Sequence, residues 1–337
     1  MNLEDLEKLD SEKMFKTYDK WPEIAKQSFG SNFEKLNVKR IDHLVFAGMG
    51  GSGSVGDVIS AILSKENIHV SNVKGYLLPK TVDSNTLIII ISVSGNTQET
   101  LSILQSAHSS DASVIAFSSG GKIEEYCTNE KIPFQKISME HSPRASFPSF
   151  LFGILNVLEK IVPINKEDTQ AAISSLEETK NKIYSHNLNE ENISLKLAKK
   201  ITKIPLVYYP KGFEAAAIRF KNSLQENSKL HVITENVLET CHNGIVAWKN
   251  DNNFQPILIR GHDDHNKTKE RWTVLKEFFQ TKNIDYLELY SLEGSILTKI
   301  VNLIYVLDYA SIYHAIINNI DPSPVESIDF VKKRISV

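Results

Sequence analysis

Two stretches of the chain alternate short apolar runs with amphipathic segments, a pattern that predicts strands and helices in turn. In the first stretch we expect the strands Leu44–Ala47, Gly75–Pro79, Leu87–Ile91, Val114–Phe117 and Phe134–Ile137, and the helices Val55–Leu63, Thr97–His108 and Phe147–Ile161. In the second stretch we expect the strands Pro205–Tyr209, Leu230–Thr234, Gln255–Arg260 and Tyr286–Tyr290, and the helices Glu214–Gln225 and Ile296–Ile317. Alternation of this kind is typical of doubly wound parallel sheets in an α/β protein.

The pattern divides the chain into four predicted parts. Residues 1–40 are a helical N-terminal arm, because Leu3, Leu6 and Leu9 have helical spacing and Trp21-Pro22 marks a break. Residues 41–165 and 201–337 are two α/β domains, and the second ends in a C-terminal helix. The polar residues 166–200 between them are a helical connector with a solvated face. Two similar halves in tandem suggest two copies of one fold.

Composition excludes several classes of protein. The 337 residues are 41% hydrophobic and 23% charged, which is ordinary for a soluble globular protein with two full cores. The net charge of −3 gives no basic surface for nucleic acid. Cys127 and Cys241 form neither a disulfide framework nor a Cys-x-x-Cys metal pattern. The N-terminus is too charged for a signal peptide, and charged residues interrupt the apolar stretches within about ten residues, too short for a bilayer. We therefore expect a cytoplasmic protein.

Three hydroxyl side chains follow the most apolar predicted strand. Ser92, Ser94 and Thr97 come directly after Leu87–Ile91, a run without polar alternation that predicts a buried strand of a parallel sheet. They lie where a helix begins, and helix N-termini bind anions, most often phosphate, through unpaired N–H groups. The alternative is that these hydroxyls only cap the helix.

A glycine-rich turn follows the preceding strand. Gly50, Gly51 and Ser52 belong to the stretch Gly48–Ser54, in which Gly48, Gly50 and Gly53 also match the dinucleotide pattern Gly-x-Gly-x-x-Gly. That pattern calls for an acidic residue after the next strand, and the predicted strand at Gly75–Pro79 ends without one. The glycines could also serve only the shape of the turn. Two such turns in one α/β unit favour a phosphate cradle.

Three residues are candidates for proton transfer or charge stabilisation. Glu226 ends a predicted helix, where the helix dipole disfavours a negative charge and so helps a carboxylate accept a proton. His242 could move protons, or it could cap a helix or bond a carbonyl. Arg144 lies just before a helix and could stabilise an oxyanion, or it could be a surface arginine. Glu226 could likewise be an exposed residue that pairs with Lys229.

One short stretch, His262-Asp263-Asp264-His265, resembles a set of metal ligands. It has no cysteine or further histidine nearby in the sequence, so a solvated loop leading into a helix is the better interpretation. We predict no metal and no cofactor.

The two turns resemble those of the sugar isomerase (SIS) fold, and the whole set of motifs resembles the bifunctional phosphoglucose/phosphomannose isomerases of archaea and some bacteria. Seven motifs occur in the family's order: Gly-Met-Gly-Gly-Ser at Gly48–Ser52, Ser-x-Ser-Gly-Asn-Thr-x-Glu-Thr at Ser92–Thr100, Pro-Arg-Ala at Pro143–Ala145, Glu-Asn-Ser-Lys at Glu226–Lys229, His-Asn-x-Ile-Val-x-Trp at His242–Trp248, Asp-x-x-Ser-x-Tyr-x-Ala at Asp308–Ala315 and Asp-Pro-x-Pro-Val-x-x-Ile-x-x-x-Lys at Asp321–Lys332. The resemblance implies two tandem SIS-type domains.

The resemblance also implies roles for individual residues. Glu226 would be the base, His242 with Lys332 would open the sugar ring, and Arg144 would stand beside the enediolate; Lys333 is adjacent to Lys332 and is the alternative lysine. The phosphate ligands would be Ser52, Ser92, Ser94 and Thr97, with Gly50 and Gly51 nearby. Family members are homodimers in which the histidine enters the site of the neighbouring subunit.

The chain departs from the family in two places. Most relatives carry Asn-His-Asn-Glu, whereas this chain has Cys241-His242-Asn243-Gly244, which puts the orientation of the histidine in question. Ser323 stands where threonine is common.

We therefore expect an enzyme that interconverts glucose 6-phosphate and mannose 6-phosphate with fructose 6-phosphate through a metal-independent cis-enediol. Its expected partners are these hexose 6-phosphates and a second copy of the chain, with no nucleic acid and no membrane. One alternative is another phosphosugar isomerase on the same fold. The other is a non-catalytic phosphosugar sensor, which usually carries a DNA-binding module; the first 40 residues are too short and too balanced in charge for one.

Overall fold

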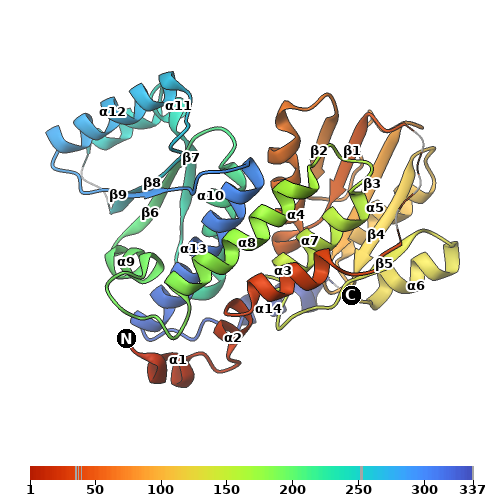
Figure 1. Ribbon diagram of the computed structural model, residues 1–337, viewed down its shortest axis with the longest axis horizontal. Coiled ribbons are helices and arrows are strands. Elements are labelled where there is room, and N and C mark those ends of the chain that lie inside the picture. Colours follow the sequence, from red (N-terminus) through yellow and green to blue (C-terminus); the bar gives the residue numbers. More distant parts are fainter. Residues whose placement is uncertain (35, 37, 39, 251–252, 336–337) are drawn as a thin grey trace. The chain divides into compact units, whose positions relative to one another are not determined.

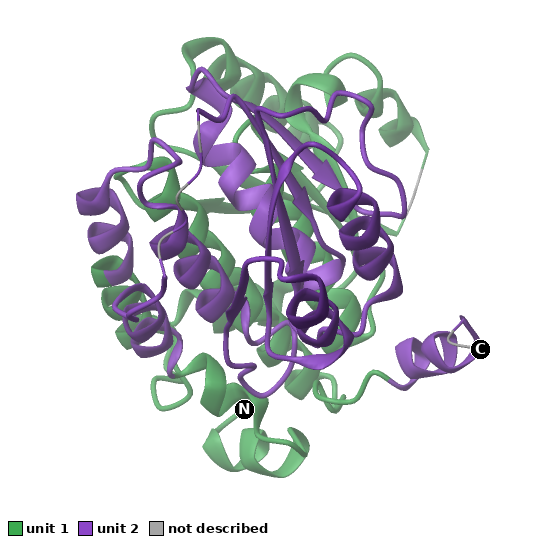
Figure 2. Cartoon of the chain, turned by 90° about the vertical axis from the view of Figure 1, so that its right-hand side faces the viewer, with its two compact units in different colours: residues 1–19, 174–325 green, residues 20–173, 326–337 purple. Residues whose placement is uncertain are grey.

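The computed structural model describes residues 1–34, 36, 38, 40–250 and 253–335, and the chain forms two compact units (Figures 1 and 2). Unit 1 comprises residues 1–19 and 174–325, and unit 2 comprises residues 20–173 and 326–337. Each unit contains one parallel sheet, so the expected α/β fold with two doubly wound sheets is confirmed. The four domain limits drawn from the sequence stay a prediction, because compactness alone does not fix them.

Unit 2 is built on a five-stranded sheet with the order β2-β1-β3-β4-β5. Its strands are β1 (His43–Ala47), β2 (His69–Val73), β3 (Thr86–Ser92), β4 (Ser113–Ser118) and β5 (Phe134–Lys136), all parallel to their neighbours. Its helices are α3 (Trp21–Phe29), α4 (Gly50–Ile62), α5 (Gln98–His108), α6 (Gly121–Glu130), α7 (Phe147–Leu158) and α14 (Glu326–Ile335), with a short 3-10 helix at Leu63–Lys65. Every residue of β3 is buried, as its uniform apolar sequence predicts.

The predicted strand at Gly75–Pro79 is wrong. This segment is a loop, and the strand lies earlier, at β2, where the sequence His69-Val70-Ser71-Asn72-Val73 is mostly polar. Because β2 pairs only with β1 and forms an edge of the sheet, it remains partly exposed and needs little apolar sequence. The residue after β2 is Lys74, so the acidic residue of a dinucleotide site is still missing.

Unit 1 is built on a four-stranded sheet with the order β7-β6-β8-β9. Its strands are β6 (Ile204–Tyr209), β7 (Ile233–Asn236), β8 (Phe254–Arg260) and β9 (Leu287–Tyr290). Its helices are α1 (Leu3–Leu9), α2 (Met14–Tyr18), α9 (Ile193–Lys200), α10 (Glu214–Ser228), α11 (Val237–Thr240), α12 (Asn266–Thr281) and α13 (Ile296–Ile317), with a 3-10 helix η2 at Gly244–Lys249. Helix α8 (Lys166–Ile183) spans the boundary between the units.

The helix boundaries follow local chemistry. Asn2 begins α1 with a capping box, in which its side chain accepts from the N–H of Asp5 and the Asp5 carboxylate accepts from the N–H of Asn2. The break expected at Trp21-Pro22 is the start of α3, because proline is favoured in the first turn of a helix.

Helix α13 is the centre of unit 1. Among the described residues it is the one helix long and apolar enough to cross a membrane, and 94% of its most apolar stretch is buried inside the structure. From the sequence we expected charged residues to end each apolar stretch within about ten residues. In α13 the charged residues Lys299 and Asp308 do not end the buried stretch, because both are themselves buried and paired. Burial of this extent identifies α13 as a core helix.

The two sheets share one topology. In each, the first strand lies beside the second and the third, and the fourth follows the third, so β2-β1-β3-β4 corresponds to β7-β6-β8-β9. The turn after β3 therefore corresponds to the turn after β8. This correspondence supports the expected duplication, which the sequence alone does not display.

Candidate active site

The serine turn lies at the carboxyl edge of the sheet in unit 2. The hydroxyl oxygens of Ser92 and Thr97 are 3.0 Å apart, and the N–H of Gly95 donates to the Ser92 hydroxyl at 3.2 Å. Gly95 has φ +69, and an added Cβ would overlap the carbonyl oxygen of Gly120, so this tight turn requires glycine. Thr97 precedes α5, but its side chain makes no capping hydrogen bond to the helix in the described structure. The first-turn N–H groups of α5 are therefore not occupied by Thr97.

The glycine turn contacts the serine turn directly. The hydroxyl of Ser52 accepts a hydrogen bond from the N–H of Val93 at 3.2 Å, and both Ser52 and Ser92 are buried. Helix α4 already begins at Gly50, inside the glycine turn, so its N-terminus also faces this edge. Four of the six expected phosphate ligands, Ser52, Ser92, Ser94 and Thr97, thus belong to two turns that share hydrogen bonds within one unit.

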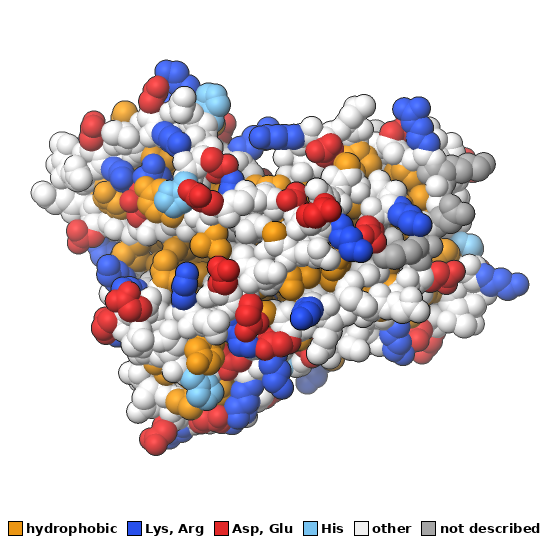
Figure 3. Space-filling view, in the orientation of Figure 1, with side chains coloured by type: hydrophobic (Ala, Val, Ile, Leu, Met, Phe, Trp, Pro, Cys, Tyr) orange, Lys and Arg blue, Asp and Glu red, His pale blue; other side chains and the backbone are white. Residues whose placement is uncertain are grey.

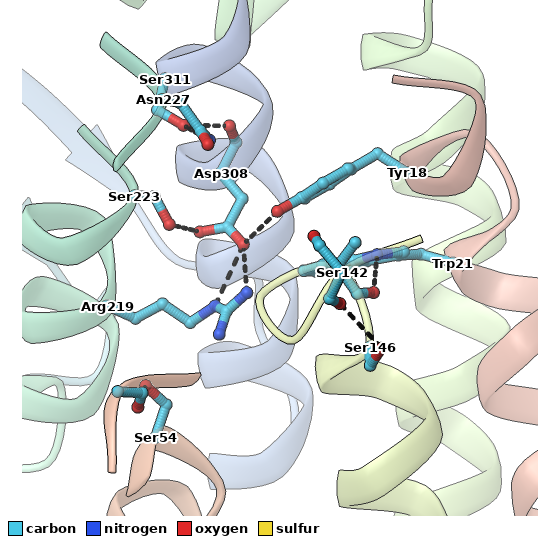
Figure 4. A network of polar contacts seen from close by, with 12 residues as sticks. Tyr18, Trp21, Ser54, Ser142, Ser146, Arg219, Ser223, Asn227, Asp308 and Ser311 are labelled. Atoms are coloured by element: carbon cyan, nitrogen blue, oxygen red, sulfur yellow. Dashed lines mark hydrogen bonds and ion pairs between the residues drawn. The ribbon is translucent and has the colours of Figure 1, made fainter. Parts of the chain in front are cut away.

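Arg144 lies against the same glycine turn. A Cβ added to Gly51 would be 3.2 Å from the carbonyl oxygen of Pro143 and 3.4 Å from the Cα of Arg144. The Arg144 side chain is 6% exposed, which does not fit a surface arginine. The segment before α7 that carries Arg144 is held by the Ser146 hydroxyl, which donates to the carbonyl of Ser142 at 2.8 Å (Figure 4).

A further contact holds this segment. The indole N–H of Trp21 donates to the carbonyl of Ala145 at 3.1 Å, also visible in Figure 4. Unit 2 therefore places the two turns and the arginine together, whereas Lys332 and Lys333 lie on α14, all of whose described residues are exposed.

Glu226 lies in the last turn of α10 in unit 1, and its side chain is partly buried. The expected helix end at Gln225 is three residues too early, because the helix continues to Ser228 and ends at Lys229. Lys229 adopts a left-handed conformation with φ 54, which terminates the helix.

The residues after Glu226 bind α13. Asn227 donates through its side-chain amide to the Ser311 hydroxyl at 2.8 Å, and the Ser228 hydroxyl donates to the Ser311 carbonyl at 2.7 Å. One and two turns earlier, Ser223 and Arg219 bind the carboxylate of Asp308, to which the Tyr18 hydroxyl also donates (Figure 4). The motifs Glu-Asn-Ser-Lys and Asp-x-x-Ser are thus two sides of one buried contact that fixes the end of α10.

His242 lies in the short connection between α11 and η2 and is exposed. Its backbone N–H donates to the carbonyl of Glu239 at 2.9 Å. The departure at Gly244 has a local reason: an added Cβ would lie 2.5 Å from a carboxylate oxygen of Glu235. Here a carboxylate from β7 occupies the space that a side chain at position 244 would need.

Glu226 and His242 lie at opposite edges of the sheet in unit 1. Helix α10 starts at the carboxyl edge after β6 and leads back to the start of β7 (Figure 1). Glu226 lies in the last turn of α10, at the end of the helix that precedes β7. His242 follows the end of β7, at the carboxyl edge. The 15 residues of α10 correspond to about 22 Å at the usual rise of a helix. Within unit 1, Glu226 and His242 therefore come from opposite edges of the sheet.

The stretch 262–265 has protein partners. Asp263 pairs with Lys299, Asp264 accepts from the indole N–H of Trp272 at 2.9 Å, and the His265 ring accepts from the N–H of Lys267 at 3.2 Å. The His262 ring stacks on Tyr290 with 4.7 Å between ring centroids. No group of three or more His, Cys, Asp or Glu side chains placed for a metal is found in the part of the chain that the structure describes.

The same stretch differs from the serine turn of unit 2 in the side chains that it carries. By topology it corresponds to the serine turn of unit 2, but it presents two carboxylates where the serine turn presents hydroxyls. Carboxylates repel a phosphate.

On the face shown in Figure 3, basic and acidic side chains are mixed over the surface, in line with the small net charge.

Sequence reasoning did not single out Arg219, and it named Asp308 and Lys229 without their contacts. Arg219 and Asp308 are charged yet 2% and 0% exposed, and Lys229 binds four backbone carbonyls. The spacing on α10 gave a signal for Arg219, because Arg219, Ser223 and Asn227 recur every four residues and so share one polar stripe of the helix.

Comparisons with known proteins agree with the geometry. Residues 37–152 match the model of the SIS domain, and residues 190–335 match that of the bacterial phospho-glucose isomerase C-terminal SIS domain. The chain is 31% identical over 336 residues to a bifunctional phosphoglucose/phosphomannose isomerase of Caldicellulosiruptor bescii, covering 96% of this chain and 99% of that one. It is also 26% identical to a D-glucosamine-6-phosphate 4-epimerase of Sulfolobus acidocaldarius, over 73% of this chain and 77% of that one.

The fold is shared with solved structures. A hypothetical protein from Thermus thermophilus superimposes with a TM-score of 0.76 at 12% identity, covering 99% of this chain and 94% of that one. The two SIS domains, the ordered motifs and the identity over nearly the full length lead to one assignment: the chain belongs to the bifunctional phosphoglucose/phosphomannose isomerase family.

Proposed function

We propose that this protein interconverts glucose 6-phosphate and mannose 6-phosphate with fructose 6-phosphate. The observation that carries the proposal is the cradle in unit 2, where the Ser92 and Thr97 hydroxyls lie 3.0 Å apart and the N–H of Val93 donates to the Ser52 hydroxyl, beside the start of two helices. Hydroxyl groups and helix N-termini suit a phosphate. Ser94 and the amides of Gly50 and Gly51 complete the proposed set of ligands.

The reaction needs a base that is held firmly and a cation for developing negative charge. Glu226 would take the proton from C2 of the aldose and return it to C1 of the enediol, and its place on a helix end fixed to α13 suits that role. Buried Arg144 would stabilise the charge on the enediol oxygens. Rotation of the intermediate about C2–C3 would present either face to the base, which would explain acceptance of both C2 epimers.

Ring opening requires a second proton relay. His242 with Lys332 would move a proton between the ring oxygen and the hydroxyl at C1 or C2, and Lys333 remains the alternative lysine. We infer that His242 serves the site of a neighbouring subunit, because Glu226 and His242 of one chain lie at opposite edges of the unit 1 sheet. The active protein would therefore be a homodimer, which we place in the cytoplasm.

A relative with another activity supports a second candidate. One relative of this chain is a D-glucosamine-6-phosphate 4-epimerase, which by its name acts at a different carbon of a phosphosugar. For this chain the candidate reaction would be epimerisation of an amino sugar 6-phosphate. The ring-opening and enediol residues favour the isomerase.

A coupled assay with each substrate tests the proposal. Fructose 6-phosphate should be converted to both aldose 6-phosphates, and dialysis against EDTA should leave the rates unchanged, because Arg144 supplies the positive charge. Glucosamine 6-phosphate should be inert. Turnover of glucosamine 6-phosphate alone would favour the epimerase, and loss of activity on dialysis that Zn²⁺ restores would overturn the metal-independent route.

A further inference from the structure

Lys229 joins two segments of unit 1 that the proposed mechanism treats separately. Its ammonium group donates to the carbonyl of Glu226 at 2.8 Å and to that of Asn227 at 3.4 Å. It also donates to the carbonyls of Asp321 and Pro324, each at 3.0 Å. These four bonds connect the end of α10 to the segment between α13 and α14.

The first two carbonyls belong to the last turn of α10. Carbonyls in the last turn of a helix have no partner within the helix, and a cation there also suits the helix dipole. Because one of them is the carbonyl of Glu226 itself, the ammonium group fixes the backbone of the residue that we propose as the base.

The other two carbonyls belong to the segment from which α14 starts. Ser323 in this segment donates through its hydroxyl to the carboxylate of Asp10 at 2.6 Å, and Asp10 is fully buried. The segment is thus held from both sides, by the N-terminal arm and by Lys229. Helix α14 begins two residues after Pro324 and carries Lys332.

The backbone at Lys229 also calls for an explanation. With φ 54 it occupies the left-handed region, where glycine is the most favourable residue at the end of a helix. A side chain that makes four hydrogen bonds offsets that cost.

We propose that Lys229 is a positioning residue, which holds the Glu226 backbone and the segment from Asp321 to Pro324 at fixed places in unit 1 for proton transfer. The inference rests on the proposed function, because it assumes that Glu226 and Lys332 act on the substrate. Lys229 itself touches no substrate in this scheme.

The test compares glycine and arginine at this position in the full-length enzyme. Lys229→Gly keeps the left-handed turn but removes the ammonium group, so kcat should fall by about 10–100-fold through misplacement of the base. The KM for fructose 6-phosphate should stay near its wild-type value, since the phosphate cradle is unchanged. Lys229→Arg retains a cation with several donors and should recover part of kcat.

The chain offers a matched control. Lys131 ends α6 in the same left-handed conformation, with φ 55, so Lys131→Gly makes the same chemical change at a second helix end. Its kcat should equal that of the wild type. Lys131→Gly should melt at or above the wild-type temperature, because glycine relieves the left-handed backbone. In Lys229→Gly the same relief is set against the loss of four hydrogen bonds.

The outcomes separate this inference from the proposed function. If Lys229→Gly keeps the wild-type kcat while Glu226→Gln is inactive, the positioning role is wrong and the base assignment stands. If Glu226→Gln is fully active, the base assignment is wrong, and the positioning role that rests on it is wrong as well. A fall in kcat that accompanies a lower melting temperature, and that arginine does not reverse, would also contradict the positioning role.

Discussion

Arg219 and Asp308 form an ion pair with both partners buried. The guanidinium donates to one carboxylate oxygen from Nε at 3.0 Å and from Nη2 at 2.7 Å. The side chains are 2% and 0% exposed, and Ser223 donates to the other oxygen at 2.7 Å. The pair joins α10 to α13 two turns before Glu226, so the helix that carries the proposed base is held to α13 by a buried ion pair.

Removing one partner of this pair should destabilise the protein strongly. Asp308→Asn leaves the Arg219 guanidinium buried without its counter-charge, and such changes cost about 3–5 kcal/mol of unfolding free energy. Chemical denaturation of both proteins measures the difference. Glu270→Ala, which removes an exposed pair with Lys267, should change stability by less than about 1 kcal/mol. Equal effects of the two substitutions would contradict a structural role for the buried pair.

Negative charge in the serine turn should abolish phosphate binding. Ser94→Asp with Thr97→Asp places two carboxylates where we expect the substrate dianion, so the affinity for fructose 6-phosphate should collapse while the fold persists. The control, Gln105→Asp with Ser106→Asp, adds the same charge to the exposed face of α5. Calorimetry measures both. Unchanged binding in the first variant would place the phosphate elsewhere.

Acid should weaken unit 2 through His43. This ring is 5% exposed, and burial, aided by the neighbouring His69, holds the pKa of His43 below its ordinary value. The unfolded chain therefore binds the proton more readily, and the stabilisation is lost as the pH falls below about 6.5. Melting temperatures between pH 7.5 and 5.5 should fall in the wild type and fall less in His43→Gln. The difference is partial, because burial lowers the pKa of His314 as well. A steeper fall in the variant would contradict this account.

Subunit exchange tests whether His242 acts in the neighbouring site. Glu226→Gln and His242→Ala should each be nearly inactive. After random exchange about half of the dimers are mixed, and each mixed dimer has one site with both residues intact, so activity should rise to about a quarter of the wild type. A mixture that stays inactive although exchange is shown by native mass spectrometry would mean that each site is built from one chain.

Much of this fold could be predicted from the sequence. The strand β3 and the helix α13 have largely apolar sequences that predict burial, and α13 spans the predicted residues Ile296–Ile317. The strand β2 could not be found in this way, because an edge strand is stabilised on one side only and its sequence is polar.

The candidate site, too, could be predicted only in part. The serine and glycine turns were predicted as a pair, and the Ser52–Val93 hydrogen bond joins them. The contact of Asn227 with Ser311 depends on two helices that are distant in sequence, and no local pattern reveals which polar residues will meet. The motifs gave the residues but not their partners.

The most direct test of the central claim is the turnover and binding of Glu226→Gln. The substitution keeps the shape of the side chain and removes the proton acceptor, so kcat on glucose 6-phosphate and mannose 6-phosphate should fall by about 10²–10⁴-fold. The dissociation constant for fructose 6-phosphate should stay close to that of the wild type. Glu277→Gln, a neutralised exposed glutamate on α12 of the same unit, should be fully active. Near wild-type turnover of Glu226→Gln on both aldoses would show that Glu226 is structural and would contradict the account.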